Sequence, residues 1–545
     1  MHKSARFVLC TIIFLSLFFL GAPSLWSFAT SANLLYQKNG DSASDNLGYS
    51  VAGAGDVNGD GKADFIVGAP YTSLDGVSSA GSAYIYSGAT GTVLYHKKGA
   101  TDDDNLGWSV AGAGDVNGDS KADFIVGAPF ADPGGAIGAG SSFVYSGTTG
   151  ALLYQIDGDT ASLSGISVAG AGDVNGDGKD DFIIGAPIDS PGGLANAGSA
   201  FVFSGATGDT LYRKDGSAAG DFLGFFVAGA GDVNGDGKAD FLIGAPYASP
   251  GGRTNAGSAY VYSGAGGALL YQKDGVAAGD LLGLSVAGAQ DINGDGTADF
   301  VIGAPFASPG VLTNAGSAFV YSGATGALLY QKDGALDLDQ LGTSVAGAGD
   351  VNGDGKADFF IGAPYADSGS LVDAGAAYLY SGADGFLLFE KEGLDSDLLG
   401  SSVAGVGDAT GDGKAEFIIG APNAQPNGLF GAGSAYVYGL ISTDAPKEKP
   451  LHPLKFELSQ NYPNPFNPTT TIRYSLPKAQ KVKLEIFNII GQRVKVLENG
   501  EQTAGEHTLT WNGADEKGEI VPSGVYFYKL TGENLRESKK LIFLK

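Results

Sequence analysis

Short apolar runs separated by Gly, Asp and Ser turns fill most of the chain. In the first set, Tyr49–Gly55 consists mainly of small residues, Phe65–Ala69 is wholly apolar, and Ala83–Ser87 alternates between two faces. Thr92–Lys97 forms a fourth run. Runs of five to seven residues bounded by turn-forming residues are typical of antiparallel strands. The pattern predicts a four-stranded sheet in which the small-residue strand is innermost.

This set of runs repeats along the chain with a nine-residue acidic loop after each small-residue run. The loops begin at Asp56, Asp115, Asp173, Asp232, Asp291, Asp350 and Asp408, a spacing of 58 or 59 residues, and the first reads DVNGDGKAD. Four short strands in a repeat of this period predict one blade of a β-propeller. Seven repeats therefore predict a seven-bladed ring.

The ends of the repeated region predict how the ring closes. Asn33–Lys38 (NLLYQK) matches the last strand of a blade, whereas the seventh repeat stops at Gly433–Tyr438, before its own last strand. The first segment can therefore complete the last blade and leave no open sheet edge. We expect an all-β chain with a closed propeller over residues 33–438.

The acidic loops carry the candidate chemistry. Side-chain oxygens recur at loop positions 1, 3, 5 and 9, and position 7 can add a backbone carbonyl. The five residues of each loop are Asp56, Asn58, Asp60, Lys62 and Asp64; Asp115, Asn117, Asp119, Lys121 and Asp123; Asp173, Asn175, Asp177, Lys179 and Asp181; Asp232, Asn234, Asp236, Lys238 and Asp240; Asp291, Asn293, Asp295, Thr297 and Asp299; Asp350, Asn352, Asp354, Lys356 and Asp358; and Asp408, Thr410, Asp412, Lys414 and Glu416. Hard oxygen donors favour Ca²⁺ over zinc or copper. Hairpin turns alone would explain Asn-Gly and Asp-Gly but do not need three carboxylates.

Three departures from the loop pattern change individual expectations. Ser120 replaces the glycine of position 6, where a left-handed backbone is expected, so we expect weaker cation binding there. Thr410 and Glu416 make the seventh loop the least regular site. Asp180 is an additional acid beside Asp181, and we expect it to be solvated. The prediction is Ca²⁺ at up to seven loops.

Charge is distributed unevenly. The chain has a net charge of −27, and residues 455–545 carry +3, so the first 454 residues carry −30. Such an acidic surface argues against nucleic acid or an anionic membrane as a partner. Much of the acidity belongs to the loops.

Residues 1–31 have the pattern of an export signal. Lys3 and Arg6 precede an apolar run at Phe7–Leu20, which is too short for a comfortable membrane span. An uncleaved anchor is the alternative. Cys10, the only cysteine, lies in that run, so we expect a mature protein without disulfides and without a transmembrane segment.

Beyond the repeats, residues 439–454 are rich in Pro and Lys and predict a linker. Residues 455–545 alternate apolar and polar positions, as at Val482, Leu484 and Ile486, and predict a small β-sandwich. An immunoglobulin-like domain that binds a ligand itself is one reading of this segment.

Two resemblances rest on these motifs. The repeats, with intact Gly-Ala-Pro triplets such as Gly68-Ala69-Pro70, resemble the FG-GAP repeats of integrin α-subunit propellers. That likeness implies calcium in the acidic loops, on the face opposite the ligand site. Residues 461–477 (NYPNPFNPTTTIRYSLP), 486–494 and 522–530 resemble the C-terminal sorting domain of type IX secretion. That likeness implies export by the type IX machinery and a secreted or surface-attached protein of a Bacteroidetes-like Gram-negative bacterium.

No catalytic constellation is evident. The four histidines, His2, His96, His452 and His507, lie far apart in the sequence, and the carboxylate pairs belong to the loops. We expect no enzyme activity, although a propeller face can hold the acid and base of a polysaccharide lyase.

The loops on the opposite face are the candidate recognition surface. Five begin with an aromatic residue, namely Tyr71, Phe130, Tyr247, Phe306 and Tyr365. These rings either stack on a sugar or peptide or pack beneath their loops. We expect a surface adhesion or recognition module for an unidentified extracellular protein or glycan. A lectin or polysaccharide lyase and a passive coat component are the alternatives.

Overall fold

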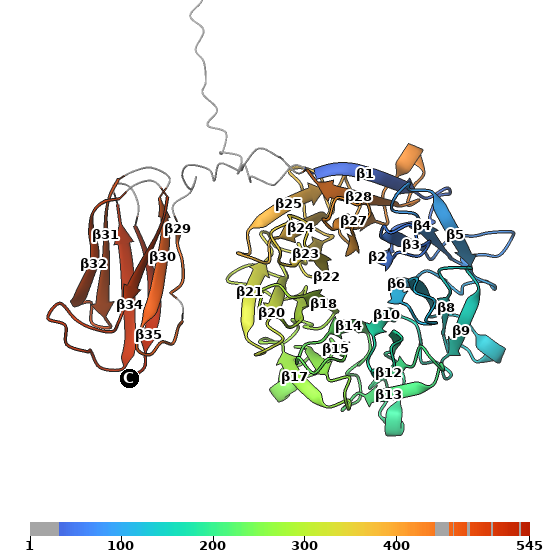
Figure 1. Ribbon diagram of the computed structural model, residues 1–545, viewed down its shortest axis with the longest axis horizontal. Coiled ribbons are helices and arrows are strands. Elements are labelled where there is room, and N and C mark those ends of the chain that lie inside the picture. Colours follow the sequence, from blue (N-terminus) through green and yellow to red (C-terminus); the bar gives the residue numbers. More distant parts are fainter. Residues whose placement is uncertain (1–31, 442–456, 462, 477–479, 503–504, 533–535) are drawn as a thin grey trace, which may run out of the picture. The chain divides into compact units, whose positions relative to one another are not determined.

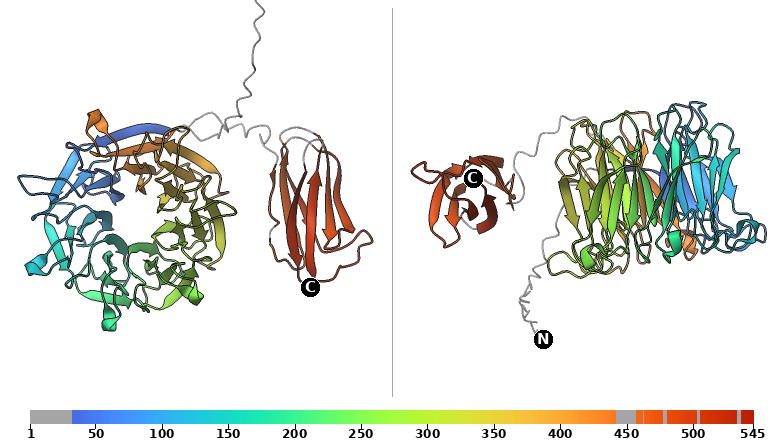
Figure 2. Two further views of the ribbon diagram at one scale, coloured as in Figure 1. Left: turned by 180° about the vertical axis from the view of Figure 1, so that it is seen from behind. Right: turned by 90° about the horizontal axis from the view of Figure 1, so that it is seen from below.

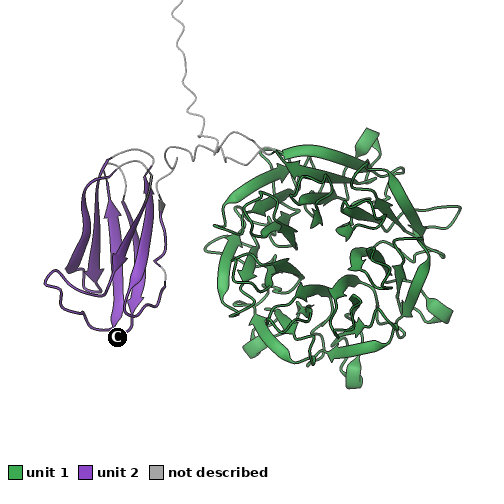
Figure 3. Cartoon of the chain, in the orientation of Figure 1, with its two compact units in different colours: residues 1–441 green, residues 442–545 purple. Residues whose placement is uncertain are grey.

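The computed structural model describes residues 32–441, 457–461, 463–476, 480–502, 505–532 and 536–545. The chain forms two compact units, Met1–Ile441 and Ser442–Lys545 (Figure 3). The predicted signal at 1–31 and residues 442–454 of the predicted linker lie outside the described residues. No helix within the described ranges has the length and apolar character needed to cross a bilayer.

The first unit is a ring of seven four-stranded antiparallel sheets (Figure 1). Blade 1 consists of β2 (Ser50–Gly55), β3 (Asp64–Ala69), β4 (Ser82–Tyr86) and β5 (Val93–Lys98), in that order from the axis outward. The edge-on view in Figure 2 shows the strands running roughly along the axis of the ring. The all-β, seven-bladed prediction is confirmed, and the first blade's strands begin and end within one residue of the predicted runs.

The other blades repeat this order. Blade 2 has β6 (Ser109–Gly114), β7 (Asp123–Ala128), β8 (Ser141–Tyr145) and β9 (Leu152–Asp157); blade 3 has β10 (Ser167–Gly172), β11 (Asp181–Ala186), β12 (Ser199–Phe203) and β13 (Thr210–Asp215); blade 4 has β14 (Phe226–Gly231), β15 (Asp240–Ala245), β16 (Ser258–Tyr262) and β17 (Leu269–Asp274); blade 5 has β18 (Ser285–Gln290), β19 (Asp299–Ala304), β20 (Ser317–Tyr321) and β21 (Leu328–Asp333); blade 6 has β22 (Ser344–Gly349), β23 (Asp358–Ala363), β24 (Ala376–Tyr380) and β25 (Leu387–Glu392). Single 3₁₀ turns, η1 (Pro133–Gly135), η2 (Pro191–Gly193), η3 (Pro250–Gly252) and η4 (Pro426–Gly428), lie between the second and third strands of four blades.

Blade 7 closes the ring. It contains β26 (Ser402–Gly407), β27 (Glu416–Ala421), β28 (Ser434–Leu440) and, as its outer strand, β1 (Ala32–Asn39). The register pairs Asn33 with Gly439 and Asn39 with Ser434. The N-terminal strand thus completes the last blade, as the two ends of the repeated region predict.

Small residues allow the inner strands to approach one another closely. A Cβ atom on Gly53 would lie 2.6 Å from the carbonyl oxygen of Gly405, and one on Gly112 would lie 2.8 Å from that of Gly53. The second strands carry the large apolar residues, and Phe65, Ile66 and Val67 are fully buried between blades. Each blade interface is therefore a separate hydrophobic cluster, such as Ile66 with Phe124.

Side chains of the outer strands form hydrogen bonds to the next blade. Tyr36 Oη donates to the carbonyl of Gly88 at 2.9 Å, and Lys38 Nζ donates to that of Gly91 at 2.6 Å. The same tyrosine contact recurs at 2.7 to 2.9 Å from Tyr95, Tyr154, Tyr212, Tyr271 and Tyr330. At the junction between blades 6 and 7, the equivalent residue is Phe389, which has no hydroxyl. Blade 7 has no hairpin between its third and fourth strands to accept a hydrogen bond, because its outer strand is β1.

The second unit is a small β-sandwich, as predicted. One sheet contains β29 (Glu457–Leu458), β30 (Thr470–Leu476) and β33 (Gly505–Trp511). The other contains β32 (Arg493–Gln502), β31 (Gln480–Asn488), β34 (Gly524–Thr531) and β35 (Arg536–Phe543) in that order. Leu484, Trp511 and Tyr528 are nearly inaccessible to solvent and belong to one core cluster shared by both sheets.

Candidate cation-binding loops and the opposite face

Each acidic loop joins the first strand of a blade to the second, and its first aspartate organises the turn. In the first loop, Asp56 Oδ1 accepts the N–H groups of Gly59 at 2.7 Å and Asp60 at 3.0 Å, while Oδ2 accepts that of Gly61 at 2.9 Å. Asp115, Asp173, Asp232, Asp291, Asp350 and Asp408 make the same three contacts. A carboxylate has about four acceptor sites, so one remains for another partner.

Position 6 adopts the left-handed backbone that the sequence predicts. Gly61 has φ 83°, and Ser120, the only side chain at this position, has φ 67°. At position 5, Asp60 Oδ1 accepts the N–H of Lys62 at 3.0 Å. The loop backbone is therefore folded by its own acidic side chains.

The position 9 carboxylate is buried at the base of the loop. Asp64 is fully buried and accepts the N–H groups of Val57 at 3.0 Å, Asn58 at 3.2 Å and Gly88 at 2.9 Å. Among the described residues, no ion pair reaches any loop carboxylate. A buried carboxylate held only by amides is short of positive charge.

This burial is reflected in the acidity of the position 9 side chains. Desolvation raises the pKa of Asp64 to about 6 despite the amide hydrogen bonds, which favour the ionised form. Burial likewise raises the pKa of Asp123, Asp181, Asp240 and Asp299 to about 6 and that of Asp358 to about 7. Burial also raises the pKa of Glu416. A cation at the loop would relieve this cost.

The seventh loop keeps the same plan with a longer acid. Glu416 Oε2 accepts the N–H groups of Ala409 at 2.6 Å and Thr410 at 3.2 Å, the two loop positions that Asp64 serves in the first loop. Thr410 Oγ1 donates to Glu416 Oε1 at 3.2 Å. Glu416 therefore reaches the position that an aspartate occupies elsewhere.

Asp180 is not simply solvated, contrary to the sequence-based expectation. Its Oδ2 accepts the N–H of Asp115, in the preceding loop, at 2.7 Å. Asp180 occupies loop position 8, which is alanine in the other six loops. The contact was not foreseeable because it depends on how neighbouring blades meet.

The side chains of one loop are close in sequence but do not converge on one point. Among the described residues, no group of three or more Asp, Glu, His or Cys side chains is arranged to hold a metal ion. The loop does supply oxygen donors on alternate residues and a buried carboxylate without a cationic partner. By donor chemistry and uncompensated charge, these residues fit Ca²⁺, and loop positions 1, 3, 5, 7 and 9 would hold it.

The opposite face carries an aromatic cluster that is only partly covered. Tyr71 and Phe130 are 37% and 38% exposed. Tyr71 contacts Tyr49 and Trp108, with ring centroids 6.1 and 6.2 Å apart, and Phe130 contacts Trp108 at 5.2 Å. These rings therefore pack against neighbours and still present an edge to solvent.

A smaller cluster lies on blade 4. Tyr247 contacts Phe222 at 5.1 Å and Phe225 at 6.4 Å. The residue directly before the inner strand is Trp108 in blade 2 and Phe225 in blade 4. The sequence analysis predicted no recognition residue at this position. Variation there among otherwise similar repeats, from Tyr49 to Ser401, was the available signal.

The tips of the same loops expose apolar side chains around the ring. Ile137 is 75% exposed, Val311 98% and Phe430 73%. Arg253, the only basic residue in these loops, donates from Nε to the carbonyl of Gly275 at 3.1 Å and is half-buried. The surface thus combines exposed apolar tips with exposed acids such as Asp75, Asp102 and Asp132, and Arg253 is its one basic residue in the loops between second and third strands.

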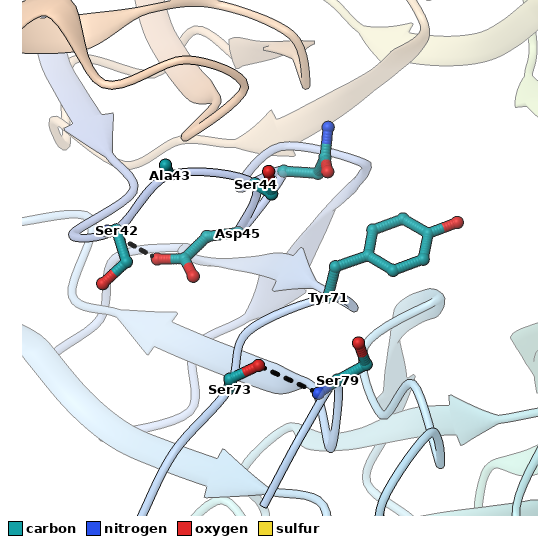
Figure 4. Close-up of a pocket in the computed structure, with 8 residues that line it drawn as sticks. Ser42, Ala43, Ser44, Asp45, Tyr71, Ser73 and Ser79 are labelled. Carbon is teal, nitrogen blue, oxygen red and sulfur yellow. Dashed lines mark hydrogen bonds between the residues drawn. The ribbon is translucent and has the colours of Figure 1, made fainter. Parts of the chain in front are cut away.

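A pocket of about 550 Å³ lies on this face between two loops of adjacent blades (Figure 4). Ser42 to Asn46 line it from the loop between β1 and β2, and Tyr71, Ser73 and Ser79 line it from the loop between β3 and β4. The N–H of Ser42 donates to Asp45 at 2.8 Å, and the N–H of Ser79 donates to Ser73 at 3.0 Å, so both loops are internally braced. Hydroxyls beside an aromatic ring suit a polar ligand such as a sugar.

Comparison with protein families matches both units. The FG-GAP repeat profile matches residues 47–86, 106–145, 164–203, 224–262, 282–321, 341–380 and 399–438, together more than half of the chain. The FlgD Ig-like domain profile matches residues 467–535. The second match describes an immunoglobulin-like domain and does not assign export to it.

Similar proteins include integrin α chains. Integrin alpha-5 of Xenopus laevis is 32% identical over 227 residues, which cover 37% of this chain and 20% of that protein. Integrin alpha-4 of Xenopus laevis is 32% identical over 260 residues, covering 45% and 24%, and integrin alpha-IIb of Homo sapiens is 32% identical over 231 residues, covering 36% and 20%. The chain thus spans about a fifth to a quarter of the length of these relatives.

Among solved structures, PorZ of Porphyromonas gingivalis aligns with a TM-score of 0.39 and 14% sequence identity, over 94% of this chain and 61% of that one. PorZ is described as an essential bacterial surface component of the type IX secretion system.

Proposed function

The chain belongs to the FG-GAP repeat family, and from this premise we propose that it is a secreted, cell-surface, calcium-binding propeller that acts as an adhesion or recognition module. The observation that carries the proposal is the difference in side chains between the two faces of the ring. One face holds seven acidic loops of one design, and the other holds exposed aromatic and apolar side chains.

Calcium is proposed for the acidic face. The support is the oxygen-only donor set and the buried position 9 acid without a cationic partner among the described residues. The repeats resemble the FG-GAP repeats of integrin α chains, and that likeness implies Ca²⁺ in these loops. Calcium here would stiffen the loops and would take no part in catalysis.

Ligand recognition is proposed for the aromatic face. Tyr71, Trp108 and Phe130 form a rigid, partly exposed group, and rigid aromatic side chains give contact area at low entropic cost. The repeated apolar tips favour many weak contacts with an extended protein or glycan, which gain strength through avidity. The pocket beside Tyr71 favours a glycan as the second candidate ligand.

Binding without turnover is proposed over catalysis. Of the described histidines, His96 is 3.0 Å from Ser82 Oγ and stacks on Tyr84, and His507 stacks on Tyr474 in the second unit. Burial lowers the pKa of His96 and favours its neutral form, and the nearby carboxylate of Asp41 opposes that shift. A polysaccharide lyase stays the enzymatic alternative, and turnover of a polysaccharide would establish it.

Export through the type IX machinery is proposed for residues 455–545. The support is the sequence likeness of residues 461–477, 486–494 and 522–530 to sorting domains together with an independent β-sandwich core. Surface attachment in a Bacteroidetes-like bacterium follows from that proposal.

The test is a glycan and protein array screen of residues 33–438, with calcium and with chelator. We expect calcium-dependent binding that Trp108→Ala weakens. Phe386→Ala is the matched control, because Phe386 is 59% exposed but lies in a hairpin on the acidic-loop face. Binding reduced equally by both variants, or polysaccharide cleavage, would contradict the adhesion proposal.

A further inference from the structure

Backbone hydrogen bonds join the seven acidic loops into a closed ring. The N–H of loop position 8 donates to the carbonyl of position 1 in the preceding loop, as from Ala122 to Asp56 at 3.1 Å. The other six bonds, at 2.9 to 3.2 Å, run from Ala63 to Asp408, Asp180 to Asp115, Ala239 to Asp173, Ala298 to Asp232, Ala357 to Asp291 and Ala415 to Asp350. Every loop is therefore held by the blade that follows it.

Lysines add a second bond in the same direction. Lys121 Nζ donates to the carbonyl of Asn58, at position 3 of the preceding loop, at 2.9 Å. Equivalent bonds run from Lys62 to Thr410 at 2.7 Å, Lys238 to Asn175 at 2.7 Å and Lys356 to Asn293 at 2.8 Å. Position 3 is one of the proposed ligand residues, so the lysine forms a hydrogen bond with the backbone of the cation site in the preceding loop.

Lys179 and Lys414 lie over the preceding loop, but no hydrogen bond to its position 3 carbonyl is found for them among the described residues. The fifth loop has no lysine at position 7. A Cβ on Gly118 would lie 3.1 Å from Lys179 Cε, and one on Gly353 would lie 3.0 Å from Lys414 Cε. Position 7 of the fifth loop is Thr297, whose Oγ1 donates to Asp295 of its own loop at 2.6 Å. The fourth loop, residues 232–240, thus keeps only the backbone bond.

We propose that the position 7 lysine is a positioning residue for the cation site of the preceding loop, and that it couples calcium binding in neighbouring loops. The inference rests on the proposed calcium function. The position 7 carbonyl is expected to bind the cation of its own loop, while the side chain of the same residue holds the loop before it. A cation that orders one loop thereby fixes the lysine that orders the preceding loop.

The direction of the effect follows from entropy and charge together. A loop whose position 1 and position 3 carbonyls are already fixed loses less conformational freedom when it binds a cation. The lysine charge opposes cation binding, but the ammonium donates to a carbonyl at a half-buried site near solvent, which weakens the repulsion. Ordering therefore outweighs repulsion, and the coupling is positive and reciprocal.

Hydrogen–deuterium exchange of the full chain tests this inference. In chelator, we expect Lys121→Met to speed amide exchange in residues 56–64 about two- to fivefold, the size expected for losing one charged contact near the surface. Exchange in residues 173–181 should not change. Lys98→Met is the matched control, because Lys98 pairs with Asp75 at 3.2 Å and makes no hydrogen bond to an acidic loop among the described residues. Thr297→Lys should slow exchange in residues 232–240.

The same measurement in calcium separates the inference from the function on which it rests. We expect calcium to protect every loop and Lys121→Met to raise the calcium concentration needed to protect residues 56–64. Unchanged exchange in that loop, or protection at lower calcium, would overturn the lysine role and leave the calcium proposal in place. If calcium protects no loop, the calcium proposal falls, and this inference falls with it.

Discussion

At the sixth residue of each acidic loop, the backbone must take a left-handed turn, and Ser120 is the one residue there that has a side chain. The glycines at this position have φ values of 83° to 90°, and Ser120 has φ 67°. An L-residue in this region costs about 1 to 2 kcal/mol. The second loop therefore carries strain that the others avoid.

We expect Ser120→Gly to stabilise the chain. The gain in the free energy of unfolding should reach at most about 1 kcal/mol, because the freer unfolded chain offsets part of the relieved strain. Thermal melting with and without calcium measures it. Ser78→Gly is the control, since Ser78 lies outside the left-handed region. A variant Ser120→Gly that melts no higher than the natural chain would contradict this account.

The sequence predicts residue roles well where they depend only on the repeat. The alternating acids and the left-handed sixth position follow from nine consecutive residues, and the structure shows the predicted turn. The contact of Asp180 with the Asp115 amide was missed because it joins two blades. Ligation of calcium by the five positions of each loop stays a prediction.

At the scale of the strand, β1 is the element on which closure depends. It pairs with β28 over Asn33 to Asn39 and also carries Tyr36 and Lys38, which contact blade 1. Its sequence differs little from β17 or β21, so its special role comes from its position before the first repeat.

Deleting residues 33–40 should open the ring. We expect β28 to present an unpaired edge, and exposed edges promote association. The variant should melt lower and form oligomers, as measured by calorimetry and light scattering. A chain that begins at Ala32 is the control, because it retains all of β1. A monomeric deletion variant with an unchanged melting temperature would show that the ring closes in another way.

Strand boundaries were predictable to about one residue because turn-forming residues bracket every apolar run. The hydrogen bonds between blades could not be predicted from the sequence, because the partner of Tyr95 Oη is a backbone carbonyl 52 residues away. Phe389 is understood only once the missing hairpin of blade 7 is seen.

For the whole molecule, calcium should act as part of the folded structure. Ions that bind only the folded ring stabilise it by linkage, about 2.7 kcal/mol per site when the free ion exceeds its dissociation constant a hundredfold. We expect chelation to lower the melting temperature of the propeller strongly. Magnesium should restore little, because it demands a tighter octahedral geometry.

Differential scanning calorimetry measures this effect with an internal control. The second unit carries no acidic loop, so its transition should not respond to chelator. A propeller transition that is equally unresponsive would refute the calcium assignment.

Removal of the second unit tests both independence and export. The propeller has its own blade clusters, and the sandwich has a core of residues 458–543 alone, so each should fold without the other. Truncation after Ser442 should leave the melting temperature of the propeller within about 2 °C of its value in the full chain. In a domain of about 150 to 250 residues, a stability change of about 1 kcal/mol already shifts the melting temperature by roughly 2 to 4 °C, so a smaller shift means that little stability is lost.

In the native bacterium the truncated chain should stay in the periplasm, because the proposed sorting segment is absent. Cell fractionation and surface labelling measure this. Normal surface display would refute the sorting role, and collapse of the propeller would show that the second unit supports its fold.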